Sequence, residues 1–246
     1  MGKISIVGIG PGNISDMTPK ARRAIETAEV IAGYNTYIKL ISELIGGKKI
    51  IRTAMLQEVE RCQMTIDEAR AGKSVALISS GDAGIYGMAG LVIDMILDLP
   101  ESERPQFEVI AGISAVNAAA SILGAPLMHD FAVISLSDLL TDWELIKRRV
   151  ECAAAGDFVI ALYNPKSKKR VTNILEVQEI LLRYRKKNTP VGIVTNAGRL
   201  EETKIISTLE NFTAEEINMF SLVLIGNSQT YVKAGFMITP RGYSRG

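Results

Sequence analysis

Short apolar runs alternate along the whole chain with longer segments in which apolar residues recur at helical spacing. This alternation is typical of an α/β protein, in which buried strands are followed by amphipathic helices. The first run, residues 3–8, leads into a glycine-rich turn, and Thr18-Pro19 then has the N-cap and first-turn proline of a helix. We expect strands at 3–8, 29–33, 49–52, 74–78, 107–112, 131–136, 158–165, 191–195, 205–209 and 221–226, and helices at 19–28, 58–71, 91–97, 115–123, 143–155 and 169–187.

This order of elements predicts two α/β domains. A chain of 246 residues is long enough for two modest domains or one large one. The stretch 100–105 is polar and flanked by prolines, so it marks the approach to a boundary. We place the domains at residues 1–112 and 113–246.

The rest of the chain is organised around the turn Ser79–Gly90. It follows an apolar β-branched run and precedes a helical one, and it carries four glycines between residues 81 and 90. A turn of this kind lies at the carboxyl end of a strand, where open α/β sheets bind ligands. Asp82 is its one carboxylate. Taken alone, the turn is either a ligand wall or an ordinary loop in which Asp82 caps a helix.

Composition excludes several function classes. The net charge is +1, so no bulk field favours a nucleic acid or a membrane surface as partner. One histidine and two distant cysteines leave no common metal-binding motif, and we expect no metal site. No GxSxG nucleophile turn or GxxxxGK[ST] phosphate loop occurs. The chain shows no signal-peptide pattern and no apolar run of membrane-spanning length, so we expect a cytoplasmic protein.

Small or unusual residues follow five of the expected strands. The first of these turns, Gly8-Ile9-Gly10-Pro11-Gly12, lacks the third glycine and the later acidic residue of a dinucleotide-binding fingerprint. Backbone groups, hydroxyls and one carboxylate suit a small polar ligand better than heavy acid–base chemistry. The other four turns are Gly81-Asp82-Ala83-Gly84, Gly112-Ile113-Ser114-Ala115, Tyr163-Asn164-Pro165 and Asn196-Ala197-Gly198.

Longer stretches of the chain carry a family resemblance. They are Val7–Gly12, Gly33–Tyr37, Ser79–Leu91, Leu123–Phe131, Ser135–Thr141, Tyr163–Pro165 and Asn196–Arg199. On these residues the chain resembles the tetrapyrrole methylases from end to end, and within them the group that methylates C17 of the macrocycle in cobalamin synthesis. One departure is Ala83, where proline often follows the aspartate in the wider family.

The resemblance implies two α/β domains of the tetrapyrrole methylase type, usually in a homodimer, with S-adenosylmethionine bound in the cleft between domains. The cofactor contacts that it implies are Pro11, Gly81, Asp82, Ala83, Ile85, Tyr86, Ser114, Ala115, Tyr163, Asn164, Asn196, Ala197, Gly226 and Thr239.

By the same resemblance, the expected reaction is methylation of C17 of cobalt-factor III with ring contraction, giving cobalt-precorrin-4. The alternatives are the metal-free precorrin-3B of the oxygen-dependent route, or a binding module without turnover. Ring contraction needs proton transfers, and His129 is the candidate acid–base residue, with a packed or capping histidine as the alternative. Candidate substrate contacts are Asp130, Ser135, Ser137, Asp138, Lys166 and Arg199. Capping or turn roles are the alternative for the first four, and a solvated helix start is the usual meaning of the basic run that contains Lys166.

Overall fold

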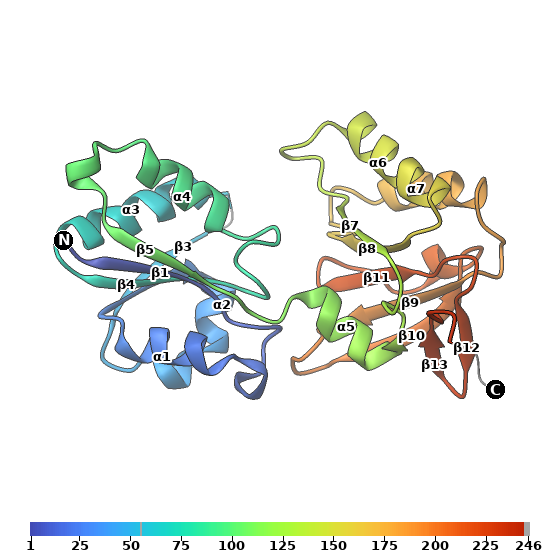
Figure 1. Cartoon of the computed structure of the whole chain (residues 1–246), viewed down its shortest axis with the longest axis horizontal. Helices are drawn as coiled ribbons and strands as arrows, with labels where there is room; N and C mark the ends of the chain where they lie inside the picture. Colours follow the sequence, from blue (N-terminus) through green and yellow to red (C-terminus); the bar gives the residue numbers. More distant parts are fainter. Residues whose placement is uncertain (55, 244–246) are drawn as a thin grey trace. The chain divides into compact units, whose positions relative to one another are not determined.

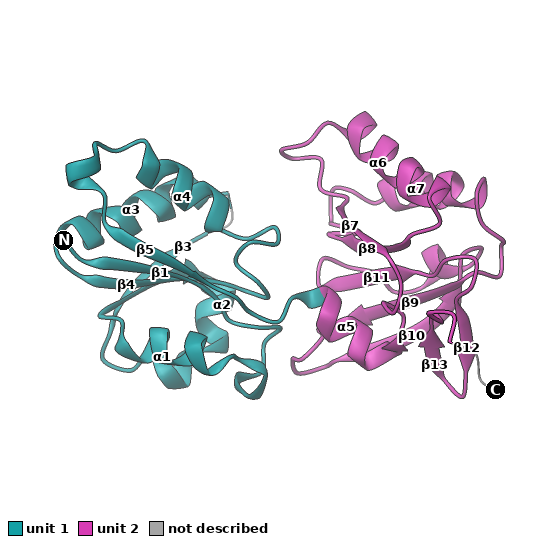
Figure 2. Cartoon of the chain, viewed as in Figure 1, with its two compact units in different colours: residues 1–115 teal, residues 116–246 magenta. Residues whose placement is uncertain are grey.

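The computed structural model of the chain describes residues 1–54 and 56–243. These divide into two compact units, Met1–Ala115 and Val116–Gly246 (Figure 2). Each unit is a β-sheet with helices packed against it, as the α/β prediction requires. The boundary predicted from the sequence, between residues 112 and 113, lies slightly before this division.

The N-terminal unit is built on five strands in the order β3-β2-β4-β1-β5, and every pair is parallel (Figure 1). Its elements are β1 (Lys3–Gly8), η1 (Ile14–Asp16), α1 (Pro19–Thr27), β2 (Val30–Tyr34), α2 (Asn35–Leu40), η2 (Ser42–Leu44), β3 (Lys49–Thr53), α3 (Glu58–Arg70), β4 (Ser74–Ser79), α4 (Ala89–Leu97), η3 (Glu101–Glu103) and β5 (Gln106–Ile110).

Alternate residues of the central strands pack into two separate cores. In β4, Val75 and Leu77 belong to the core made with α3 and α4, while Ala76 and Ile78 belong to the core made with α1 and α2. Burial on both faces explains why this strand reads as an uninterrupted apolar run in the sequence. Because all five strands are parallel, their carboxyl ends meet at one edge of the sheet.

The C-terminal unit has a mixed sheet in the order β10-β9-β11-β8-β7 and a small sheet in the order β12-β13-β6. Its elements are α5 (Ala115–Leu123), β6 (Gly124–Ala125), β7 (Phe131–Ser135), α6 (Trp143–Ala155), β8 (Val159–Tyr163), α7 (Asn173–Leu182), β9 (Pro190–Thr195), β10 (Thr203–Thr208), η4 (Phe212–Ala214), β11 (Ser221–Ile225), β12 (Tyr231–Lys233) and β13 (Phe236–Ile238). The helices α6 and α7 cover one face of the large sheet, and Leu123 of α5 packs against Gly192 on the other.

Strand direction decides which turns of this unit share an edge. β7 is parallel to β8, while β11 is antiparallel to both β8 and β9. The carboxyl ends of β7, β8 and β9 therefore meet at one edge, together with the start of β11. We call this the carboxyl edge, and the opposite edge the amino edge.

Two expectations about local structure need correction. The helix expected at 169–187 is shorter and spans only Asn173–Leu182. Before it, Ser167 and Arg170 close a turn in which the Ser167 N–H donates to the Arg170 carbonyl and the Ser167 hydroxyl accepts from the Arg170 N–H. The last strand expected from the sequence is 221–226, but Phe236–Ile238 forms a further strand, β13, which pairs with β12 and β6.

Candidate functional site

The turns after β1 and β4 are joined by a pair of backbone hydrogen bonds. The Gly10 N–H donates to the Gly81 carbonyl across 3.1 Å, and the Gly81 N–H donates to the Gly10 carbonyl across 2.8 Å. Both residues have positive φ, 79° and 69°, a conformation that glycine adopts without strain. The glycines at these positions thus allow two turns, far apart in sequence, to form one surface.

Asp82 joins a third turn to this surface. Its Oδ1 accepts a hydrogen bond from the Gly84 N–H at 2.8 Å, and its Oδ2 accepts one from the Gly112 N–H at 3.0 Å. The carboxylate therefore fixes the shape of its own turn and ties it to the turn after β5. Neither bond caps the following helix, which was the alternative role that the sequence left open for Asp82.

The three turns pack so closely that side chains have no room between them. A Cβ added to Gly112 would lie 2.2 Å from the Gly81 carbonyl oxygen, and one added to Gly8 would lie 2.7 Å from the same atom. Contacts this short with backbone atoms force the chain to move. Glycine at both positions is therefore a packing requirement of the edge.

The remaining part of the Ser79–Gly90 turn projects outward. The buried Ser79 hydroxyl accepts from the Met88 N–H at 3.2 Å, and the Ala83 carbonyl accepts from the Ala89 N–H at 3.0 Å. Between these anchors, Ile85 and Tyr86 are 37% and 56% exposed. The turn thus has a fixed base and a solvent-facing tip.

All the cofactor contacts predicted in the N-terminal unit lie at this edge. Pro11 follows the Gly10–Gly81 pair directly, and Asp82 begins the projecting turn. A Cβ on Gly81 would lie 3.6 Å from the Ala115 nitrogen and 3.7 Å from the Ser114 Cα, so these two residues adjoin the same turn. The structure brings this group together, and contact with a ligand stays a prediction for each member.

A second group forms at the carboxyl edge of the C-terminal unit. The Asn164 side-chain amide donates to the Ser135 hydroxyl at 3.0 Å, which also accepts from the Ser137 N–H at 3.2 Å. The Tyr163 hydroxyl accepts from the Val116 N–H at 3.0 Å. One hydrogen-bonded cluster therefore contains Asn164, a predicted cofactor residue, and Ser135 and Ser137, which are predicted substrate residues. Tyr163, another predicted cofactor residue, directly precedes Asn164.

Asn196 lies at the same edge, two strands away from Asn164. Both asparagines directly follow their strands and have positive φ, 55° and 50°. Asparagine is one of the few residues with a side chain that tolerates this conformation. Ala197 and Arg199 follow in the same connection, and Lys166 follows Asn164; all three are partly buried.

Arg170 is the residue at this edge that the sequence did not single out from its basic run. Its side chain is 10% exposed, one Nη donates to Asp138 Oδ1 at 3.3 Å, and the other donates to the Asn164 carbonyl at 2.9 Å. Its Nε is buried and has no hydrogen-bond partner among the described residues. A run of four cationic residues predicts a solvated segment. The only signal in the sequence that sets Arg170 apart is its planar guanidinium, which can make several hydrogen bonds at once.

Four predicted site residues lie elsewhere. His129 and Asp130 precede β7, at the amino edge, where the Asp130 carbonyl accepts from the Val159 N–H. Gly226 follows the antiparallel β11 and also falls at the amino edge, with its N–H donating to the Pro190 carbonyl.

Thr239 is fully buried and shares a 2.8 Å hydrogen bond with the Thr230 hydroxyl. A Cβ on Gly226 would lie 2.7 Å from the Thr230 Cβ, so Thr239 groups with Gly226. The structure does not bring these two residues, or His129 and Asp130, to the Asn164 cluster.

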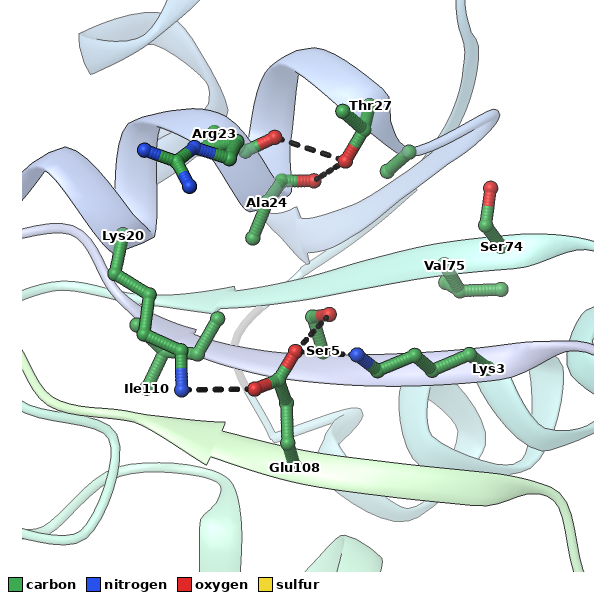
Figure 3. Close-up of a pocket in the computed structure, with 11 residues that line it drawn as sticks. Lys3, Ser5, Lys20, Arg23, Ala24, Thr27, Ser74, Val75, Glu108 and Ile110 are labelled. Atoms are coloured by element: carbon green, nitrogen blue, oxygen red, sulfur yellow. Dashed lines mark hydrogen bonds and ion pairs between the residues drawn. The ribbon is translucent and has the colours of Figure 1, made fainter.

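A cavity of about 280 Å³ lies away from these turns, between α1 and the sheet of the N-terminal unit (Figure 3). Glu108 lies in its wall and pairs with Lys3 at 2.6 Å and Lys20 at 2.8 Å. Hydrogen bonds from Lys20 and Lys3 lower the pKa of Glu108 to about 2. These charges tie α1 to β1 and β5.

In residues 1–54 and 56–243, no three or more His, Cys, Asp or Glu side chains are grouped so as to hold a metal ion. Within the same residues, no helix has the length and apolar character needed to cross a membrane.

Comparisons with known proteins give a consistent result. Residues 3–213 match the family model of the Tetrapyrrole (Corrin/Porphyrin) Methylases. The chain is 49% identical over 243 residues to the "Probable cobalt-factor III C(17)-methyltransferase" of Salmonella typhimurium, covering 98% of this chain and 99% of the relative.

A second relative and a solved structure agree with this match. The "Cobalt-factor III methyltransferase" of Priestia megaterium is 50% identical over 246 residues, but the chain spans only 46% of its length. The crystal structure of the methyltransferase CobJ has a TM-score of 0.92 and 32% identity, and the match covers 98% of this chain and all of that one.

Proposed function

The chain belongs to the tetrapyrrole methylase family, and we propose that it transfers a methyl group from S-adenosylmethionine to C17 of cobalt-factor III, with contraction of the ring. The observation that carries this proposal is the 49% identity to the Salmonella typhimurium protein named for this reaction, which extends over 99% of that protein. The family, the α/β fold and the methyltransferase class expected from the sequence are confirmed.

In the N-terminal unit, the edge formed by the turns after β1, β4 and β5 fits the methyl donor that this family uses. Gly10, Gly81 and Gly112 bring three turns together without side chains between them, so backbone groups line the surface. Such a surface suits a ligand with the polarity of an adenosine and an amino acid. We propose that Pro11, the turn from Gly81 to Tyr86, and Ser114-Ala115 hold it.

When bound, S-adenosylmethionine supplies a methyl group that is already activated by a sulfonium. The chain therefore has to align donor and acceptor and exclude water rather than create a strong nucleophile. Positioning of this kind lowers a bimolecular barrier by roughly 7–11 kcal/mol. Transfer of this group therefore does not depend on a nucleophilic side chain of the chain.

In the C-terminal unit, Tyr163, Asn164, Asn196 and Ala197 are the proposed cofactor residues at the carboxyl edge. The Ser135 hydroxyl accepts from the Asn164 side chain and Arg170 donates to the Asn164 carbonyl, so both contacts hold Asn164 at its positive φ. Gly226 and Thr239 form a separate buried group. We propose a supporting role for that pair in the fold of the last strands.

The test is anaerobic incubation of the full chain with S-adenosylmethionine labelled in the methyl group and cobalt-factor III. We expect one labelled methyl in the tetrapyrrole by mass spectrometry, and the absorption spectrum of a contracted ring. Parallel reactions contain the metal-free precorrin-3B or no tetrapyrrole. Binding of the donor without transfer to any tetrapyrrole would contradict the proposal and favour a binding module; transfer only to precorrin-3B would move the substrate to the oxygen-dependent route.

We propose in addition that the active form is a homodimer in the cytoplasm. The family resemblance supports both statements. Light scattering of the purified chain at several concentrations measures the mass in solution, and a mass of one chain throughout would contradict the first statement. Cell fractionation tests the second.

A further inference from the structure

Four large apolar side chains extend into solvent at the carboxyl edge of the C-terminal sheet. They are Leu139, Leu140, Leu200 and Phe220, which are 68%, 100%, 92% and 57% exposed. We call this set the apolar rim. Leu139 and Leu140 lie between β7 and α6, Leu200 lies between β9 and β10, and Phe220 directly precedes β11.

The sheet register places these residues along one edge. Ser135 at the end of β7 pairs with Tyr163 at the end of β8, and Thr195 at the end of β9 pairs with Ser221 at the start of β11. The Asn196 N–H donates to the Phe220 carbonyl at 3.1 Å. Because the order is β9-β11-β8-β7, the rim extends over three strand spacings, roughly 15 Å.

Both connections that carry the leucines are held by hydrogen bonds. Leu136, just before Leu139, is fully buried, and Asp138 pairs with Arg170. On the other side, the Asp142 carboxylate caps α6 by accepting from the Glu144 and Leu145 N–H groups.

In the second connection, the Glu202 carboxylate accepts from the Gly198 N–H at 2.7 Å. The Arg199 N–H donates to the Asn196 carbonyl at 2.9 Å. The leucines of the rim are thus exposed on anchored segments. When an apolar ligand covers such anchored side chains, their apolar surface is removed from water, which favours binding.

The connection beside Leu139 and Leu140 is strongly cationic. Between β8 and α7, residues 164–172 include Lys166, Lys168, Lys169 and Arg170 and no carboxylate. Arg170 pairs with Asp138, whereas Lys168 and Lys169 are exposed. The edge therefore offers apolar contacts next to positive charge, which suits a flat apolar molecule that carries carboxylates around its margin.

We propose that the apolar rim binds one face of the tetrapyrrole, with carboxylates of the macrocycle directed toward Lys168 and Lys169. This inference rests on the proposed function and specifies which surface of the chain recognises the acceptor. Arg170 acts as a positioning residue, because it fixes Asp138 in the leucine connection and the carbonyl of Asn164 in the neighbouring turn.

The first test is the double variant L139S/L140S, with L97N as the matched control, because Leu97 is 49% exposed on α4 of the other unit. We expect the double variant to raise KM for cobalt-factor III at least tenfold, with kcat and the affinity for S-adenosylmethionine changed less than twofold. Equal KM values for wild type and double variant would overturn the inference.

The second test reverses charge with K168E/K169E. We expect weaker binding of cobalt-factor III, measured by titration of its absorption spectrum, and a smaller dependence of binding on salt. Unchanged affinity and salt dependence would remove the lysines from the proposal. For Arg170, R170K keeps the charge but not the planar fork, and we expect an increase in KM with circular dichroism unchanged.

The two proposals fail in different ways. If wild type binds the tetrapyrrole and transfers no methyl group, the proposed function fails while the titrations still test the rim. If wild type transfers the methyl group and L139S/L140S does so with the same KM, only the rim fails. If the double variant changes the mass in solution and leaves tetrapyrrole binding intact, the rim is an interface between copies of the chain and the inference is overturned.

Discussion

The carboxylate of Asp82 accepts a hydrogen bond from the Gly112 N–H at 3.0 Å, although the two residues are 30 positions apart in the chain. This bond links the turn after β4 to the turn after β5. The other carboxylate oxygen accepts from Gly84 within its own turn. Asp82 therefore determines how the turns after β4 and β5 are arranged in the N-terminal unit. We expect it to affect ligand binding through the backbone that it holds in place.

Replacement of Asp82 by alanine removes both bonds and should weaken the binding of S-adenosylmethionine about tenfold or more. Hydrogen bonds to a charged group contribute about 1.5–3 kcal/mol each, and part of this loss appears as reduced order of the turn. Calorimetric titration of the donor measures the effect, and circular dichroism checks that the variant is folded.

The controls for this variant are D82N and D98A. Asparagine retains one acceptor oxygen and should lose less affinity than alanine, whereas Asp98 is exposed at the end of α4 and its loss should leave binding unchanged. If D82A binds S-adenosylmethionine with the affinity of the wild type, the turn is an ordinary connection and has no part in donor binding.

Gly112→Ala should destabilise the N-terminal unit by about 3 kcal/mol, because its Cβ would lie 2.2 Å from a backbone oxygen. Gly90→Ala is the matched control: it lies in α4, nothing would approach its Cβ within 4 Å, and alanine is the better helix former. Urea unfolding of the full chain should show a loss for the first and no loss for the second. Equal stability of the two variants would contradict the close packing of the three turns.

Glu108 should make the stability of the chain depend on pH in the acid range (Figure 3). Its pKa in the folded state is lowered from 4.5 to about 2, so its stabilising effect is complete above pH 4.5 and is lost as pH falls toward 2. Because the carboxylate is partly exposed, we expect E108Q to cost only about 1 kcal/mol at pH 7. The difference from wild type should disappear near pH 2.

The matched control is E26Q. Glu26 pairs with Arg22 on the exposed surface of α1, with side chains 46% and 53% exposed, and such pairs contribute little. Its unfolding curve should follow wild type at both pH values. If E108Q follows wild type at pH 7 as well, the two lysine contacts do not stabilise the unit.

Hydrophobic periodicity was sufficient to predict most of the N-terminal unit. β4 is buried on both faces and reads as a continuous apolar run, so its position and the glycine-rich turn after it follow from local sequence. The hydrogen bonds of Asp82 do not follow, because Gly112 is local to a different strand. A capping aspartate and a bridging aspartate have the same sequence context.

The C-terminal unit was less predictable because strand direction leaves no mark in an apolar pattern. β11 runs antiparallel to its neighbours, which puts Gly226 at the edge opposite Asn164 and Asn196. The family resemblance groups all three as cofactor contacts without regard to strand direction. Arg170 was missed as an individual residue for a related reason, since its partners Asp138 and Asn164 come from two different connections.

His129 provides the last prediction, because the structure separates it from the other site candidates. β7 runs from Phe131 to Ser135, roughly 13 Å, so His129, which precedes it, lies at the opposite end of this strand from the Asn164 cluster. Its side chain is 45% exposed; Nδ1 accepts from the Asp130 N–H at 2.9 Å and lies 3.4 Å from the Asp130 carboxylate. We predict that H129A leaves the affinity for S-adenosylmethionine unchanged, since no predicted donor contact lies beside it.

If His129 supplies a proton during ring contraction, the variant should still add the methyl group but form the contracted product more slowly, and H129Q should not restore the rate. Stopped reactions analysed by mass spectrometry and absorption separate the two steps. Wild-type rates for both steps in H129A would show that the exposed imidazole has no part in the reaction and would leave proton transfer to water or to the macrocycle's own carboxyl groups.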